Sequence, residues 1–154
     1  MASTVGFATE EIDTAAPTRA ARLKWVVVVN EELPTGVAAN AVVCVAAATA
    51  TGVEGLLGAD AVDADGAAHP GLPWAGCTVL RASADQLRSL RSAAATSEGA
   101  FVADMPAAAQ STRVYDEYRA QLAEIPGDDI EYYAVSIVGP RNRVDRLVRR
   151  LPLL

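Results

Sequence analysis

The sequence predicts a single α/β domain in which short apolar strands alternate with helices. Three observations lead to this prediction. The four consecutive valines Val26–Val29 form a β-branched run of strand length, apolar on both faces like the strands inside a parallel sheet. An alanine-rich apolar segment of helix length follows, and further strand-like and helix-like segments alternate after it. With 154 residues, the chain is long enough for one hydrophobic core without metal or disulfide staples.

The first half of the chain contains one clear strand and one clear helix. The strand covers 25–30 and the helix covers 36–51, where alanine favours helix and the apolar side chains favour packing on a sheet. Residues 1–22 lack sustained periodicity and predict a flexible or loosely packed arm, with one short helix around Thr9–Ala16. The Gly-, Pro- and Asp-rich residues 53–76 predict a long loop that is functional or carries a short hairpin.

The second half predicts three more strands and further helices. Ser83 and Gln86 have the spacing of a capping box, which opens a helix. Pro140 stands at a helix's first position, where its missing N–H costs nothing. The predicted strands cover 77–81, 100–103 and 132–138, and the helices follow Ser83, run between Pro106 and Pro126, and cover 141–151.

The last predicted helix separates apolar from basic side chains. Val144, Leu147, Val148 and Leu151 fall on one side, and Arg143, Arg146, Arg149 and Arg150 fall on the other. The arginines either contact phosphate or form the solvent face, and the clean apolar stripe favours the solvent face.

Composition and charge restrict the partners. The net charge of −6 argues against broad capture of nucleic acid, although it allows a local basic patch. Cys44 and Cys77 have no metal or CxxC spacing, so we expect two reduced core residues in a cytoplasmic protein. No apolar run reaches the roughly 18 residues that span a bilayer, and there is no secretory pattern. We therefore expect a cytoplasmic protein that contacts neither a membrane nor nucleic acid.

The predicted site lies where strands end and helices begin, because ligands of open α/β sheets bind there. Asn30, Glu31 and Thr35 follow the first strand, and we expect their turn to share one cavity with Asp104, which ends another strand. Asn40 is the one strongly polar side chain on an apolar helix face, so we expect a buried amide that either donates to a substrate carbonyl or ties the helix to the turn. Asp104 is either a general base or a helix cap.

The long loop holds the single histidine, His69, which is either a proton shuttle or an exposed loop residue. Asp60, Asp63 and Asp65 lie near it, but this spacing matches no calcium or zinc motif, so we expect no metal. The tyrosines, Tyr115 among them, predict an aromatic wall of the pocket or a packing surface.

Several motifs in their order resemble type-2 peptidyl-tRNA hydrolases: KWVVVVNEEL with VAAN, Asp104 with Gln110, Gly139-Pro140 before Val144-Asp145, and the closing LPLL. The longer phrases VNEELPTGVAAN, DGAAHPGLPW, YDEY and GPRNRVD look more like a sister family of the same superfamily, the domain of unknown function numbered two thousand. Where the hydrolases carry a Gly-Lys-Gly-Lys run, Gly36 is followed here by Val37.

The resemblance implies a three-layer α/β/α sandwich over residues 23–154, with a four-stranded, mixed and mostly parallel sheet, and a homodimer without a cofactor. We expect an enzyme that hydrolyses an amide or ester of a small acyl or aminoacyl compound. A non-catalytic ligand-binding or scaffold protein is the alternative, and a true peptidyl-tRNA hydrolase is the third reading. The expected catalytic residues are Asn40, Asp104 and His69, and the expected substrate-binding residues are Asn30, Glu31, Thr35, Gln110 and Tyr115.

Overall fold

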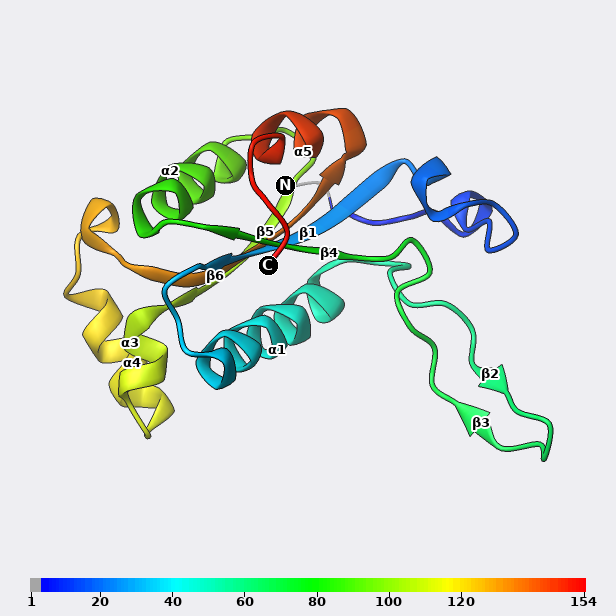
Figure 1. The fold of residues 1–154 in the computed structure, drawn as a ribbon, viewed down its shortest axis with the longest axis horizontal. Coiled ribbons are helices and arrows are strands. Elements are labelled where there is room, and N and C mark those ends of the chain that lie inside the picture. Colours follow the sequence, from blue (N-terminus) through cyan, green and yellow to red (C-terminus); the bar gives the residue numbers. More distant parts are fainter. Residues whose placement is uncertain (1–3) are drawn as a thin grey trace.

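The computed structural model describes residues 4–154, which form a mixed α/β fold around a four-stranded sheet (Figure 1). The strand order across the sheet is β4-β1-β6-β5. These strands are β1 (Leu23–Asn30), β4 (Thr78–Ala82), β5 (Phe101–Pro106) and β6 (Tyr132–Pro140).

Helices lie on both faces of the sheet. One face carries α1 and the other carries α2 and α5, whereas α3 and α4 lie beyond the end of β5 (Figure 1). The helices are α1 (Thr35–Gly52), α2 (Ala84–Ala95), α3 (Ala107–Ser111), α4 (Tyr115–Ala123) and α5 (Arg141–Val148). The single helical region predicted between Pro106 and Pro126 is thus two helices, and the last helix ends three residues before Leu151.

The expected mostly parallel sheet is wrong, because only β1 and β4 run parallel. β6 lies between β1 and β5 and is antiparallel to both. An apolar run indicates that a strand is buried on both faces of a sheet, but it does not indicate the direction of the neighbouring strand. β6 is itself almost wholly buried, so its sequence resembles that of a central parallel strand.

The core lies on both sides of β1, as the valine run predicted. Val27 and Val29 pack in the cluster under α1, whereas Val26 and Val28 pack in the cluster under α2 and α5. Each valine is at most 1 % exposed, because successive side chains of a strand point to opposite faces.

A chain of buried hydroxyl groups joins α1 to the sheet. The Trp25 indole N–H donates to Ser136 Oγ at 2.8 Å, and the hydroxyls of Ser136 and Thr49 lie 2.7 Å apart. The Thr49 hydroxyl donates to the Val45 carbonyl at 2.7 Å. Ser136 therefore donates to Thr49, and each member of the chain has a partner.

Two local signals in the second half are confirmed, the capping box and the apolar stripe of the last helix, whereas Pro140 is the N-cap of α5 and Arg141 its first residue. The Gln86 N–H donates to Ser83 Oγ at 3.2 Å, and the Ser83 N–H donates to Gln86 Oε1 at 2.9 Å, which completes the capping box. The apolar stripe of α5 packs on the sheet, with Val144 and Val148 buried.

Residues 4–22, expected as a flexible arm, pack against the rest of the domain; residues 1–3 lie outside the described residues. Phe7 is buried against Trp74, with ring centroids 4.7 Å apart, and its N–H donates to the Glu54 carbonyl at 2.9 Å. Within the segment, Glu11 forms an ion pair with Arg22, the residue directly before β1. The segment contacts the domain through separate side chains such as Phe7, not through one face of a long helix or strand, so its sequence shows no sustained periodicity.

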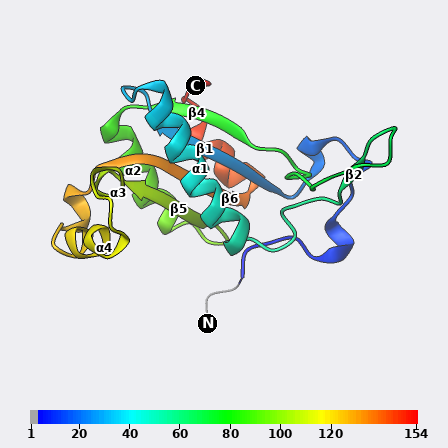
Figure 2. The same cartoon turned by 90° about the horizontal axis from the view of Figure 1, so that it is seen from below.

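Residues 53–76 contain the short hairpin that the turn residues allowed. Its strands β2 (Ala61–Val62) and β3 (Ala68–His69) are exposed, and Gly66 takes a positive φ of 86° in the turn. The hairpin projects from the body at the opposite end from α3 and α4 (Figures 1 and 2).

The chain after α5 covers the outer edge of β4. The Arg81 N–H donates to the Pro152 carbonyl at 3.0 Å, and the Leu154 N–H donates to the Val79 carbonyl at 3.2 Å. These bonds occupy backbone groups that an edge strand otherwise presents to other chains.

Candidate functional site

A cleft of about 480 Å³ lies between α1 and the α3–α4 segment, beside the end of β5. Its size falls within the range typical of small-molecule sites. Four residues expected in the site from the sequence line this cleft: Asn40, Asp104, Gln110 and Tyr115.

The α1 wall of the cleft carries Asn40 and, one helical turn later, Cys44. The sequence suggested that Asn40 is a buried amide, but it is exposed, because α1 packs on the sheet through Ala38 and Ala41 instead. The Cys44 thiol contacts Asn40 Oδ1 at 3.8 Å and donates to it. The amide nitrogen carries two N–H donors, with which Asn40 can bind a ligand in the cleft.

Asp104 lies on β5, lines the cleft and is ion-paired. Its Oδ2 accepts a hydrogen bond from Arg91 Nε of α2 at 3.1 Å, and its side chain is 20 % exposed. It does not cap the next helix, because Pro106 occupies that position. The Arg91 guanidinium also lies over the Tyr132 ring, 5.9 Å from its centroid. This second contact helps to hold Arg91 in place as the partner of Asp104.

The α3–α4 wall is polar and aromatic. Gln110 and Arg113 are exposed beside the cleft. The rings of Tyr115 and Tyr118 meet edge to face, with centroids 5.5 Å apart. Loss of water, followed by the nearby charge of Asp104, raises the pKa of Tyr118. This phenol therefore stays protonated at neutral pH and is a hydrogen-bond donor.

The turn after β1 does not line this cleft, which corrects the expected shared cavity. Asn30 is 4 % exposed, and its Oδ1 accepts the Glu32 N–H at 3.0 Å, so the amide holds its own turn. Glu31 and Thr35 are exposed in and after that turn. The cause is β6, which separates β1 from β5 by two strand spacings, about 10 Å.

His69 belongs to β3 of the hairpin, which lies at the other end of the molecule from α3 and α4, the helices that form one wall of the cleft (Figure 2). Its Nε2 lies 3.2 Å from Asp63 Oδ2, and Asp60 Oδ1 accepts the Gly71 N–H at 2.9 Å. Hydrogen bonds from the Ala67 backbone and then from His69 lower the pKa of Asp63. These hydrogen bonds stabilise the hairpin itself. His69 is therefore separated from Asn40 and Asp104, the other two expected catalytic residues.

Residues 4–154 contain no group of three His, Cys, Asp or Glu side chains arranged to hold a metal ion. Cys44 and Cys77 are free, but both are exposed, which corrects their expected burial. Cys44 is exposed because it shares the outer side of α1 with Asn40, and Cys77 because it lies just before β4.

Sequence reasoning missed three polar lining residues: Cys44, Thr112 and Arg113. A helical spacing of four residues from Asn40 already placed Cys44 on the same side of the helix. Thr112 and Arg113 had no such signal, because they lie in the break between α3 and α4.

Among the described residues, α1 alone has the length and mean hydropathy, 1.4, of a membrane-crossing helix. The core helix of a soluble protein passes the same test, and α1 buries Ala38, Ala41, Val45 and Thr49 against the sheet. Its outer side is nevertheless free of charge, since the helix contains no ionisable residue other than Cys44.

Comparison with known proteins gives a family and a fold. Residues 23–154 match a family described as protein of unknown function (DUF2000). A solved structure of a protein of unknown function, Atu0240 from Agrobacterium tumefaciens str. C58, is similar with a TM-score of 0.79 and 14% sequence identity. The match covers 86% of this chain and 98% of that one, so it shows a shared fold. No protein with a curated description matches the chain.

Proposed function

Because the chain belongs to the DUF2000 family, whose function is unknown, we propose a function from the cleft itself: it binds a small anion that contains an amide group. The observation behind this proposal is that Asn40 of α1, Gln110 of α3 and Arg113 line one cleft. Asn and Gln each offer a donor and an acceptor that match an amide, and Arg matches a carboxylate. N-acyl amino acids and short peptides combine these two groups.

Binding fits the geometry better than hydrolysis. Amide or ester hydrolysis needs a group that takes up a proton. Among the described residues that line the cleft, Asp104 carries the only carboxylate, and Arg91 holds one of its oxygens. His69 lies elsewhere.

Titration calorimetry with N-acetyl amino acids and dipeptides tests the binding proposal. We expect Asn40→Ala and Gln110→Ala each to weaken binding about tenfold, the effect of one lost hydrogen bond of about 1.4 kcal/mol. His69→Ala, in the hairpin, is the matched control and leaves binding unchanged. Equal losses in all three variants, or no binding by any compound of the panel, contradict the proposal.

Hydrolysis of an amide or ester of the same compounds is the second candidate, supported by the presence of Asp104 and Asn40 in the lining of one cleft. Asn40 then donates to the developing oxyanion, and Asp104 orients a water. Chromatography of the panel after incubation tests it: Asp104→Asn abolishes turnover, whereas wild-type turnover in this variant contradicts it.

We also propose that the family shares the sandwich fold of type-2 peptidyl-tRNA hydrolases. Support comes from α1 on one face of the sheet and α2 and α5 on the other, and from Asp104 and Gln110 in one cleft. Peptidyl-tRNA cleavage is the third function, and the missing lysines after Gly36 argue against it. A direct cleavage assay with peptidyl-tRNA decides this point.

A cytoplasmic homodimer remains our proposal for assembly and location. The outer side of α1 supports the dimer: Val43 is 65% exposed, and two copies of this uncharged surface meet without the repulsion that the net charge of −6 causes elsewhere. Sedimentation of the wild type and Val43→Arg tests it. A dimer that the variant dissociates supports this interface, and a monomeric wild type overturns it. Cell fractionation tests the location.

A further inference from the structure

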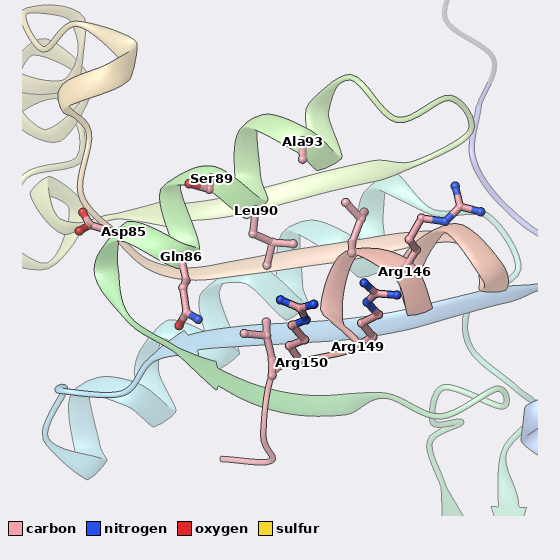
Figure 3. Close-up of a pocket in the computed structure, with 10 residues that line it drawn as sticks. Asp85, Gln86, Ser89, Leu90, Ala93, Arg146, Arg149 and Arg150 are labelled. Carbon is pink, nitrogen blue, oxygen red and sulfur yellow. The ribbon is translucent and has the colours of Figure 1, made fainter.

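A second groove, of about 580 Å³, lies on the other face of the sheet from α1. It runs between α2 and the end of α5 with the chain that follows (Figure 3). Three arginines line it: Arg146, Arg149 and Arg150. The cleft between α1 and α4 shares no lining residue with it.

The three arginines form an unbalanced positive cluster. None of them has a carboxylate within 4.0 Å in residues 4–154, whereas the neighbouring Arg143 pairs with Glu98 at 3.4 Å. Arg146 belongs to α5, whereas Arg149 and Arg150 lie in the turn directly after it, and all three line the groove. In a chain with a net charge of −6, three unpaired guanidinium groups beside one groove favour an anion there.

The remainder of the groove is largely apolar, with Gln86, Ser89 and the carboxylate of Asp85 among its polar lining residues. Leu90 and Ala93 come from α2, and Leu147 and Leu151 come from the last helix and the chain after it. Gln86 lies across from Arg150 (Figure 3). A ligand here meets guanidinium groups and an apolar surface at once.

Carboxylates limit the length of the anion. Asp85, which pairs with Arg88 at 3.3 Å, stands at the end of the groove away from Arg146 (Figure 3). Glu98 lies beside Arg143 past the other end. These carboxylates would repel a long polyanion that extends beyond the groove, whereas a short anion fits between them.

We propose that this groove binds a small phosphorylated molecule of nucleotide size. The guanidinium groups hold the phosphate through paired N–H donors. The apolar or aromatic body of the ligand lies on the leucine surface, and the groove volume falls within the range for such ligands. The proposal does not depend on the function assigned to the cleft.

NMR titration of the full chain with ADP, adenosine and inorganic pyrophosphate tests the proposal. We expect ADP to shift the amide signals of Leu90 and Leu147, and to bind more tightly than adenosine or pyrophosphate alone. The double variant Arg149→Gln/Arg150→Gln weakens ADP binding at least about tenfold, since hydrogen bonds to charged groups are the stronger ones. Arg19→Gln removes the same kind of charge away from the groove and leaves binding unchanged.

Three outcomes overturn the proposal. The first is the absence of shifts in the groove at millimolar ADP and pyrophosphate. The second is an equal loss of binding in Arg19→Gln, which indicates general charge attraction. The third is binding of single-stranded RNA or an acidic peptide without binding of ADP, which assigns the groove to a macromolecule. Arg113→Gln changes the cleft and not the groove, so we expect it to leave ADP binding unchanged.

Discussion

Cys44 and Cys77 differ in their surroundings, which gives each residue a distinct chemical reactivity. Cys44 lines the cleft. Loss of water around the Cys77 thiol raises its pKa to about 11, although part of the residue is exposed. The thiolate is the reactive form, so at pH 8 only about one-thousandth of Cys77 is reactive.

We therefore expect iodoacetamide to label Cys44 before Cys77, as followed by mass spectrometry of the two peptides. The Cys77 rate should rise about tenfold per pH unit up to pH near 11. A ligand in the cleft should protect Cys44 alone. Cys44→Ser is the control, which leaves only the slow reaction. Fast labelling of Cys77 at neutral pH would contradict the raised pKa.

Ser136 joins Trp25 to Thr49 inside the core, so its hydroxyl serves two partners. Ser136→Ala leaves the buried indole N–H without an acceptor, and we expect a loss of about 1–3 kcal/mol in the free energy of unfolding. Urea unfolding measures it. Ser92→Ala, on the exposed side of α2, should stay within about 0.5 kcal/mol of the wild type.

At the scale of the elements, the first part of the N-terminal segment is tied by charge to Arg22, the residue directly before β1. The Arg22 guanidinium, and then the Ala8 N–H, lower the pKa of Glu11 to about 2 from its ordinary 4.5. A carboxyl whose pKa is lower in the folded protein stabilises that state when ionised. The stabilisation is thus complete above about pH 4.5 and is lost as the pH falls toward 2.

The Ala8 amide, which donates to Glu11 Oε2 at 2.8 Å, reports on this contact by NMR. We expect its signal to titrate with a midpoint near pH 2 in the wild type. In Glu11→Gln the titration should disappear. A midpoint at the ordinary carboxyl value would show that the ion pair does not form in solution.

The β4 edge is the element most exposed to wrong pairing if residues 152–154 are removed. Their deletion frees backbone groups of Val79 and Arg81, so we expect concentration-dependent self-association by size-exclusion chromatography. Leu154→Ala is the matched control, because it keeps the backbone N–H. An unchanged elution profile of the deletion variant would refute a role in edge protection.

For the whole molecule, the cleft and the arginine groove lie on opposite faces of a sheet whose central valines are buried. The two sites share no lining residue, and sites without shared partners usually act independently. Calorimetry should therefore show that Asn40→Ala leaves ADP affinity unchanged, and that Arg149→Gln/Arg150→Gln leaves affinity in the cleft unchanged. A change above about threefold in either direction would reveal coupling through the sheet.

Features encoded by near neighbours in the chain could be predicted. The valine run determines a strand buried on both faces, Ser83 and Gln86 determine a helix start, and the stripe of α5 determines which side packs. Each of these depends on residues within one or two turns or on strand alternation, so its physical cause lies within the segment itself. The motifs and their order along the sequence also predicted membership of the DUF2000 family, which the match over residues 23–154 shows.

Only the tertiary structure decided the strand directions and the composition of the site. β6 enters between β1 and β5 through contacts such as Trp25 with Ser136, which lie 111 residues apart. This insertion moves Asn30 away from Asp104, while α3 and α4 bring Gln110 and Arg113 to Asn40. The pattern within a strand fixes which faces are buried, but the choice of neighbour depends on packing between distant segments, which no local pattern contains.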